Sequence, residues 1–168
     1  GNYAVTGTVN DANYQGATAD ALVVGKAAAT VALGSLSQTH DGTPKSATAT
    51  TAPTGLAVDF TYDGSATAPT AAGSYAVMGT VDEVNYQGSS TGTLAIAKGS
   101  ATVFLQDLAQ AYDGTARTVT ATTMPAGLEV ALTYDGLGWA PTNAGSYAVT
   151  GTVVDAEYEG FATGTLEV

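Results

Sequence analysis

Three turns of the chain carry clusters of carboxylate and amide oxygens, which are the ligands that calcium prefers in proteins. Their acidic members are Asp11, Asp82, Glu83, Asp155 and Glu157. Calcium held near the boundary between two domains would stiffen an extracellular rod. The clusters differ from one another and lack the EF-hand spacing, and Asn, Asp and Gly are also what tight turns require. We therefore predict a protein without a cofactor and keep calcium as the only candidate metal.

Two aromatic residues are candidates for binding. Phe104 and Trp139 stand where an earlier copy of the same segment has Ala32 and Thr67, and both positions are expected to face solvent. Aromatic rings on the face of a β-sheet stack on sugars or form lateral protein contacts. The competing interpretation is that each ring packs on a neighbouring loop or domain.

Residues that would support catalysis are not arranged for it. His40 is the only histidine, and it replaces Tyr112 of the next copy, which predicts a turn residue and not a member of a Ser-His-Asp triad. A covalent Lys-to-Asn crosslink would need a buried Lys facing an Asn beside an acid. Lys45 corresponds to Arg117, and the last strands lack Asn. We therefore predict no catalytic residue and no enzyme.

The charge balance excludes several kinds of partner. Four basic residues accompany fifteen acidic ones, for a net charge of −11. Because so few cations cannot neutralise a line of phosphates or an anionic lipid surface, we predict neither nucleic-acid binding nor membrane insertion. The chain has no cysteine and no apolar run long enough to span a membrane. It also opens in mid-repeat without a signal peptide, which predicts a fragment of a longer protein.

An internal repeat dictates the elements that must position these residues. The segment that begins at Gly73 returns at Gly145, a spacing of 72 residues, and a third copy begins at Gly1. Self-similarity at a fixed spacing indicates a tandem array.

Short seams around Lys26 and Lys98 divide this array. They predict the C-terminal hairpin of an incomplete repeat at 1–24 and complete repeats at 25–96 and 97–168. Because so few residues link the repeats, we expect them to lie end to end as a semi-rigid rod. An isolated hairpin is marginal in water, so strands from another chain are a hypothesis for its partner.

Each complete repeat consists of short runs in which apolar residues alternate with small or polar ones. In residues 56–62, for example, Leu, Val, Phe and Tyr occupy every second position. Between the two copies the inward set stays apolar while the outward set changes, which is the pattern that burial of one face produces. We predict an all-β fold of tandem small antiparallel β-sandwich domains, immunoglobulin-like or a β-grasp variant, joined end to end.

Tyrosines and Asp-Gly pairs are expected to hold this fold together. Asp-Gly is a strong hairpin-turn dipeptide, and a preceding Tyr can cover the edge of a core while its hydroxyl reaches water. The structural candidates are Tyr62, Asp63, Gly64, Tyr75, Tyr134, Asp135, Gly136 and Tyr147.

The segment 72–77, AGSYAV, resembles the entry to the penultimate strand of bacterial immunoglobulin-like domains. A Tyr near the start of that strand is similar to the tyrosine corner of such sandwiches. With the Tyr-Asp-Gly triplets and the closing GTLAI stretch, the whole chain resembles the YDG-type and MBG-type repeats of bacterial surface adhesins. The resemblance implies extracellular stalk modules and no catalytic residue.

Three functions follow as hypotheses. The first is a structural repeat of a bacterial cell-surface adhesin, forming a stalk or fibre through contacts with neighbouring repeats of the same chain. The second is a subunit of an extracellular filament in which identical chains exchange strands. The third is a carbohydrate-binding module that acts through many weak contacts.

Overall fold

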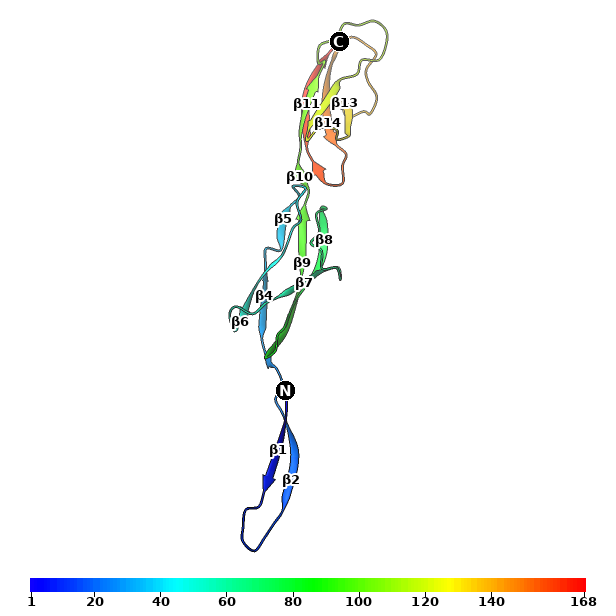
Figure 1. Cartoon of the computed structure of the whole chain (residues 1–168). Helices are drawn as coiled ribbons and strands as arrows, with labels where there is room; N and C mark the ends of the chain where they lie inside the picture. Colours follow the sequence, from blue (N-terminus) through cyan, green and yellow to red (C-terminus); the bar gives the residue numbers. More distant parts are fainter.

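The computed structural model describes all 168 residues and contains only strands, turns and loops. The chain forms a long, narrow rod of three bodies (Figure 1). A two-stranded hairpin lies at one end, followed by a first unit that ends at Ala97 and a second unit that begins at Gly99. Since no helix is present, the chain has no helical segment that could cross a membrane.

The strands recur in the same order along the rod. The hairpin contains β1 (Asn2–Thr8) and β2 (Ala17–Val23). The first unit contains β3 (Ala27–Ala28), β4 (Thr30–Gly34), β5 (Ser37–Thr39), β6 (Thr48–Ala52), β7 (Asp59–Tyr62), β8 (Gly73–Asp82) and β9 (Tyr86–Ala97). The second unit contains β10 (Gly99–Ser100), β11 (Thr102–Gln106), β12 (Thr120–Met124), β13 (Val130–Tyr134), β14 (Ser146–Val153), β15 (Tyr158–Glu159) and β16 (Phe161–Glu167).

Each unit is a small sandwich of two sheets. In the first unit β4 pairs with β6, and β7, β8 and β9 form the facing sheet. In the second unit β11 pairs with β12 and faces β13, β14 and β16. All of these pairings are antiparallel. The predicted class of all-β sandwich repeats is confirmed, and the β-grasp variant, which packs a helix on its sheet, does not fit.

Short parallel pairings join strands near the start of each unit to strands near its end. β3 pairs with the start of β9, and β5 pairs with its end. In the second unit β10 pairs in parallel with β15. The sequence predicts antiparallel pairing alone, because parallel neighbours need a long connection. The rest of the unit supplies that connection here, so this part of the prediction is wrong.

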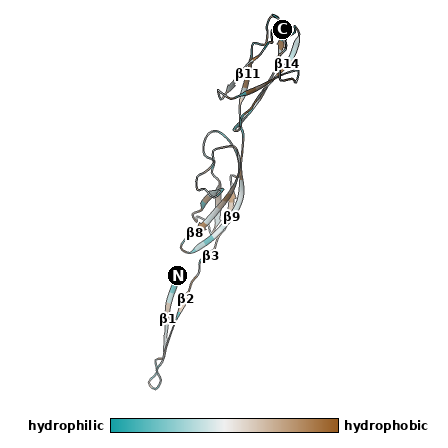
Figure 2. Ribbon diagram, turned by 90° about the vertical axis from the view of Figure 1, so that its right-hand side faces the viewer, coloured by the Kyte–Doolittle hydropathy of each residue, from teal (hydrophilic) through white to brown (hydrophobic).

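The two sheets pack closely because glycines of one face leucines of the other. A Cβ atom added to Gly79 or Gly92 would lie 3.0 or 3.2 Å from a methyl group of Leu33 on the facing strand. The predicted inward residues line this interface. Hydrophobic stretches of the ribbon occur in the strands of both units (Figure 2). The buried residues of the first core are Ala47, Tyr62, Val77, Leu94 and Ile96, and those of the second are Val119, Tyr134, Val149 and Leu166.

The hairpin has no facing sheet. Its strands pair in the register of the complete units, with Val5 opposite Asp20 as Val77 lies opposite Gly92. Every residue of β1 and β2 is exposed. Leu22, for example, is 55 % exposed, whereas its equivalent Leu94 is fully buried.

Candidate functional site at the junction of the two units

The tyrosine before each Asp-Gly turn braces the core. Tyr62 is 5 % exposed, and its hydroxyl accepts a hydrogen bond of 2.9 Å from the backbone N–H of Ala47. Tyr134 makes the same bond with Val119. The sequence predicts a hydroxyl that reaches water, and in the structure this hydroxyl also accepts a hydrogen bond from a buried backbone N–H.

The Asp-Gly pairs adopt a turn in which both residues have a positive φ. These angles are 47° at Asp63 and 84° at Gly64, and the equivalent pair Asp135 and Gly136 has 46° and 80°. Asp tolerates this conformation better than most residues, and Gly adopts it freely. The Asp63 carboxylate also accepts a hydrogen bond of 2.8 Å from the N–H of Ala76, which ties the turn to β8.

A second tyrosine braces the loop that precedes β8 or β14. The hydroxyl of Tyr75 donates to the carbonyl oxygen of Ala71, and that of Tyr147 donates to Asn143, each over 3.0 Å. Each acceptor lies four residues upstream. This is the backbone contact that a tyrosine corner makes.

The acidic turn residues are engaged in separate contacts. Asp82 forms an ion pair with Lys26. The other four accept hydrogen bonds from backbone N–H groups. Within their own turns, Asp11 accepts from Asn13, and Asp155 accepts from Glu157 and Tyr158. Across longer separations, Glu83 accepts from Ala57, and Glu157 accepts from Ala72. No group of three or more His, Cys, Asp and Glu side chains is placed to share a metal ion. Each carboxylate therefore stabilises a turn or a contact near a seam.

The two candidate aromatic residues lie on the surface of the second unit. Trp139 is 68 % exposed in the loop after β13, and Phe104 is 48 % exposed on β11, opposite Thr122 of β12.

Replacing Trp139 with Thr, the residue of the first unit, is expected to change the free energy of unfolding by less than about 0.5 kcal/mol, because an exposed ring contributes little to the core. Urea unfolding followed by circular dichroism measures this. A loss above about 1 kcal/mol would show that the ring packs on its neighbours. If the ring binds sugars, binding to a glycan array is lost in the same variant.

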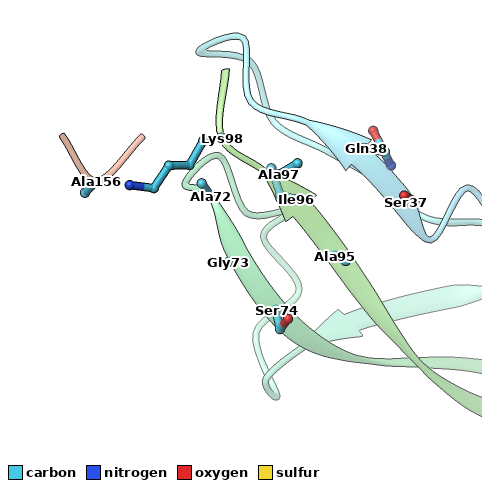
Figure 3. A pocket seen from close by; sticks show the side chains of 10 residues that line it. All are labelled: Ser37, Gln38, Ala72, Gly73, Ser74, Ala95, Ile96, Ala97, Lys98 and Ala156. Carbon is cyan, nitrogen blue, oxygen red and sulfur yellow. The ribbon is translucent and has the colours of Figure 1, made fainter. Parts of the chain in front are cut away.

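The surface carries several open grooves. An open groove of about 440 Å³ lies beside the seam of the two units (Figure 3). It is lined mostly by small residues of the first unit, with Ala156 of the second unit across the seam. Lys98 is the only titratable residue in its lining, and it reaches towards Ala156. A single cation does not form an acid-base pair, and the groove adjoins the seam between the two units.

Only one residue separates the last strand of the first unit from the first strand of the second. This residue is Lys98, between β9 and β10, and its ammonium donates to the carbonyl oxygen of Asp155. The N–H of Gly99 donates to the carbonyl oxygen of Glu157 over 2.8 Å, which starts the parallel pairing of β10 with β15. The linker is thus fixed to the second unit as soon as it leaves the first.

The Glu157 side chain connects the two units directly. One of its oxygens accepts a hydrogen bond of 2.6 Å from the N–H of Ala72, and it lies 3.2 Å from Nδ1 of His40. Nδ1 also lies 2.8 Å from the carbonyl oxygen of Thr70. Since a carbonyl oxygen only accepts, Nδ1 is the donor in its bond with Thr70. The bond from Ala72 ends on a charged carboxylate, and such bonds are stronger than those to a neutral acceptor.

An aromatic contact completes the junction. The rings of His40 and Tyr158 meet edge to face, with centroids 5.1 Å apart and an angle of 87°. Such pairs contribute about 0.5 to 1.5 kcal/mol beyond the area that they bury. Gly99 is buried beside them, and a Cβ atom there would lie 2.8 Å from the carbonyl oxygen of His40. The backbones of the two units therefore approach as closely as a glycine permits.

The loop that carries His40 is held by a local ion pair. Hydrogen bonds from Lys45 and Thr43 hold the pKa of Asp41 well below its usual range. In the second unit Thr115 is the main cause of the lowered pKa of Asp113. Both carboxylates stay charged in solutions acidic enough to protonate a free Asp, so these loops keep their bonds there.

Sequence reasoning missed the contact of His40 with Glu157. A signal was present, because both residues depart from their copies in the other unit, Tyr112 and Asn85. The two departures lie far apart in sequence and meet only in space. At the other seam Asn85 and Ala27 are exposed, and no second full unit packs on them.

The fold and the junction define a tandem array of β-sandwich repeats. The family model of the MBG domain matches residues 1–28, 29–100 and 101–168. The chain therefore belongs to the MBG domain family, as the resemblance implied, and it is an array of a repeat type associated with secreted surface proteins. Repeats of this family are structural or binding domains. Neither the curated proteins nor the solved structures contain a match to the chain.

Proposed function

We propose that the chain is a section of the extracellular stalk of a bacterial surface adhesin, and that it has no enzymatic activity. In this function the repeats hold a distal domain away from the cell. Their partners are the neighbouring repeats of the same chain.

The observation that carries this proposal is the seam at Lys98. A one-residue linker, a pairing that begins at the next residue and the Glu157 contacts together limit rotation between the units. Stiff seams give an array reach, whereas flexible seams would let it collapse into a coil. The rod shape follows from this arrangement (Figure 1).

Small-angle X-ray scattering of the purified chain is expected to give the profile of a monomeric rod roughly 100 Å long, since paired strands rise about 3.3 Å per residue. Negative-stain electron microscopy would show isolated rods. Polymers would favour the filament hypothesis, and compact particles would contradict both. Antibodies against the chain should label intact cells that make the parent protein.

Replacing Glu157 with Ala is expected to loosen the junction. The variant loses the acceptor for Ala72 and leaves that N–H to water, at a cost of about 1 to 2 kcal/mol. Each unit should keep its own unfolding transition. Donor and acceptor dyes placed on the two units should report a broader distribution of distances.

The matched control is Asn85→Ala, the same repeat position at the other seam. Asn85 is exposed there, so its removal should change neither the distance distribution nor the stability. Equal effects of the two substitutions would contradict the assignment of the stiff seam to Glu157.

A further inference from the structure

The two complete units share an open groove in which their side chains differ. It lies where β3 pairs with β9 in the first unit and where β10 pairs with β15 in the second. Its volume is about 450 Å³ in the first unit and about 550 Å³ in the second. Both volumes fall in the range of small-molecule sites, which is roughly 300 to 1,000 Å³. The fold therefore supplies the hollow, and the side chains decide what it can hold.

In the second unit four side chains with distinct chemistry meet at this groove. Thr152 of β14 lies directly opposite Phe161 of β16, and Ser100 of β10 lies beside Glu159 of β15. Residues that lie directly opposite each other on neighbouring strands present their side chains on the same face of the sheet. All four residues line the groove, which we call the Phe161 groove. Phe161 is 71 % exposed, so its ring is open to a ligand.

The first unit lacks this combination. At three of the four positions its groove has a smaller or uncharged residue, namely Ala28, Gln87 and Ser89. Only Thr152 keeps its identity, as Thr80. The same strand pairing underlies both grooves, so the second unit differs from the first by a ring, a carboxylate and a hydroxyl group.

The carboxylate of Glu159 is available to a ligand. None of the four ion pairs of the chain includes it, and no basic residue lines the Phe161 groove. In the first unit the acid in the groove is Asp82, and Lys26 already pairs with it. A carboxylate accepts up to about four hydrogen bonds, so Glu159 can hold two neighbouring hydroxyl groups of a ligand.

These groups suit an uncharged sugar. The C–H groups on one face of a pyranose ring carry partial positive charge, and they pack on the negative face of an aromatic ring. The hydroxyl groups of the sugar donate to a carboxylate and exchange hydrogen bonds with Ser and Thr.

Other classes of ligand fit the same groups poorly. An anionic ligand would be repelled by Glu159 and by the net charge of −11. An apolar ligand would bury the carboxylate without a donor, which is costly. A quaternary ammonium group is held by a cage of several aromatic rings, whereas Phe161 is the only ring in the lining of this groove.

We propose that the Phe161 groove binds one uncharged hexopyranose unit of a glycan. Phe161 stacks on the C–H face of the sugar, Glu159 accepts hydrogen bonds from two of its hydroxyl groups, and Ser100 and Thr152 bind the others. The site is separate from the two aromatic residues considered above, because Phe104 lies on the facing sheet and Trp139 follows β13 at the other edge of this sheet. The inference goes beyond the stalk function and does not depend on it.

NMR titration of the full chain tests the site. The probes are the methyl glycosides of galactose, glucose and mannose, and we expect at least one to bind with a dissociation constant on the order of 1 mM, as a ligand of this size allows. The amide signals of Thr152, Gly160 and Phe161 should shift in a saturable manner. The equivalent signals of Thr80, Gly88 and Ser89 in the first unit are the internal control and should stay in place. No saturable shift with any probe, or equal shifts in both grooves, would overturn the proposal.

Two variants test the role of the ring. Phe161→Ser restores the residue of the first unit and should weaken binding at least about tenfold, since the stacking is lost. Thr165→Ala changes an exposed residue on the same face of β16 outside the groove and should leave the affinity unchanged. Both positions are exposed, so both variants should keep the fold, which circular dichroism checks. Equal affinity of the Phe161→Ser variant and the unmodified chain would overturn the proposal.

The carboxylate is tested with a charged sugar. The methyl glycoside of galacturonic acid differs from that of galactose by a carboxylate at C6, and it should bind about threefold or more weakly because Glu159 repels it. Glu159→Gln should remove this difference. An unchanged difference would contradict the placement of the sugar beside Glu159. Choline is the probe for a cationic ligand, and saturable shifts with choline but with none of the sugars would also overturn the proposal.

Discussion

Replacing Leu166 with Ala is expected to destabilise the second unit by about 2 to 5 kcal/mol. Leu166 is fully buried, and the cavity left by its side chain would lie between two sheets that are only a few side chains thick. A domain of this size has a free energy of unfolding of about 4 to 11 kcal/mol, so the variant loses a large part of that stability. Urea unfolding, followed through the amide signals of β14 and β16, measures the loss.

The hairpin provides a matched control for this substitution. Leu22 has the same repeat position, but it is 55 % exposed. Leu22→Ala should change the stability of either unit by less than about 0.5 kcal/mol. A large loss at Leu22 would contradict the exposed placement of the hairpin.

Replacing Gly160 with Ala is expected to break the pairing that anchors the second unit to the seam. The added Cβ atom would lie 2.0 Å from the carbonyl oxygen of Ala101, and that atom is backbone and cannot rotate away. The segment around Ala101 must move, and with it the bond from its N–H to Glu159. Overpacking of this kind costs about 1 to 3 kcal/mol. Amide exchange of Gly99 and Ala101 should accelerate well before global unfolding.

The control for this prediction is Gly16→Ala in the hairpin. Gly16 has the same repeat position, but the nearest atom to an added Cβ there is a methyl group of Val9 at 3.7 Å. At this distance the added methyl group makes an ordinary van der Waals contact, so the substitution should be tolerated. If Gly16→Ala and Gly160→Ala lower the free energy of unfolding by the same amount, the collision with Ala101 does not cause the loss at Gly160.

Much of each unit could be predicted from the sequence because its signals are local. The alternation in residues 56–62 identifies the buried face, and the Asp-Gly pairs mark turns whose φ angles only such residues adopt readily. Local pattern and burial agree wherever a strand packs on its own unit.

The rest could not be predicted because it depends on residues that are distant in sequence. The pairing of β5 with β9 joins segments almost a full repeat apart and leaves no periodic pattern. The junction likewise joins His40 to Glu157, and the two residues look like ordinary turn substitutions until the units are stacked. The sequence likewise shows which oxygens the acidic turns contain, but not which N–H groups they accept from.

The parallel pairing of first and last strands also bears on how the chain would respond to being stretched. A pull along the rod draws β3 and β5 in one direction and β9 in the other. The hydrogen bonds between them lie across the direction of the pull, so the force loads all of them together in shear. They therefore cannot break one after another. A unit whose ends are joined in this way should resist tension far better than its small core suggests, which suits the proposed stalk.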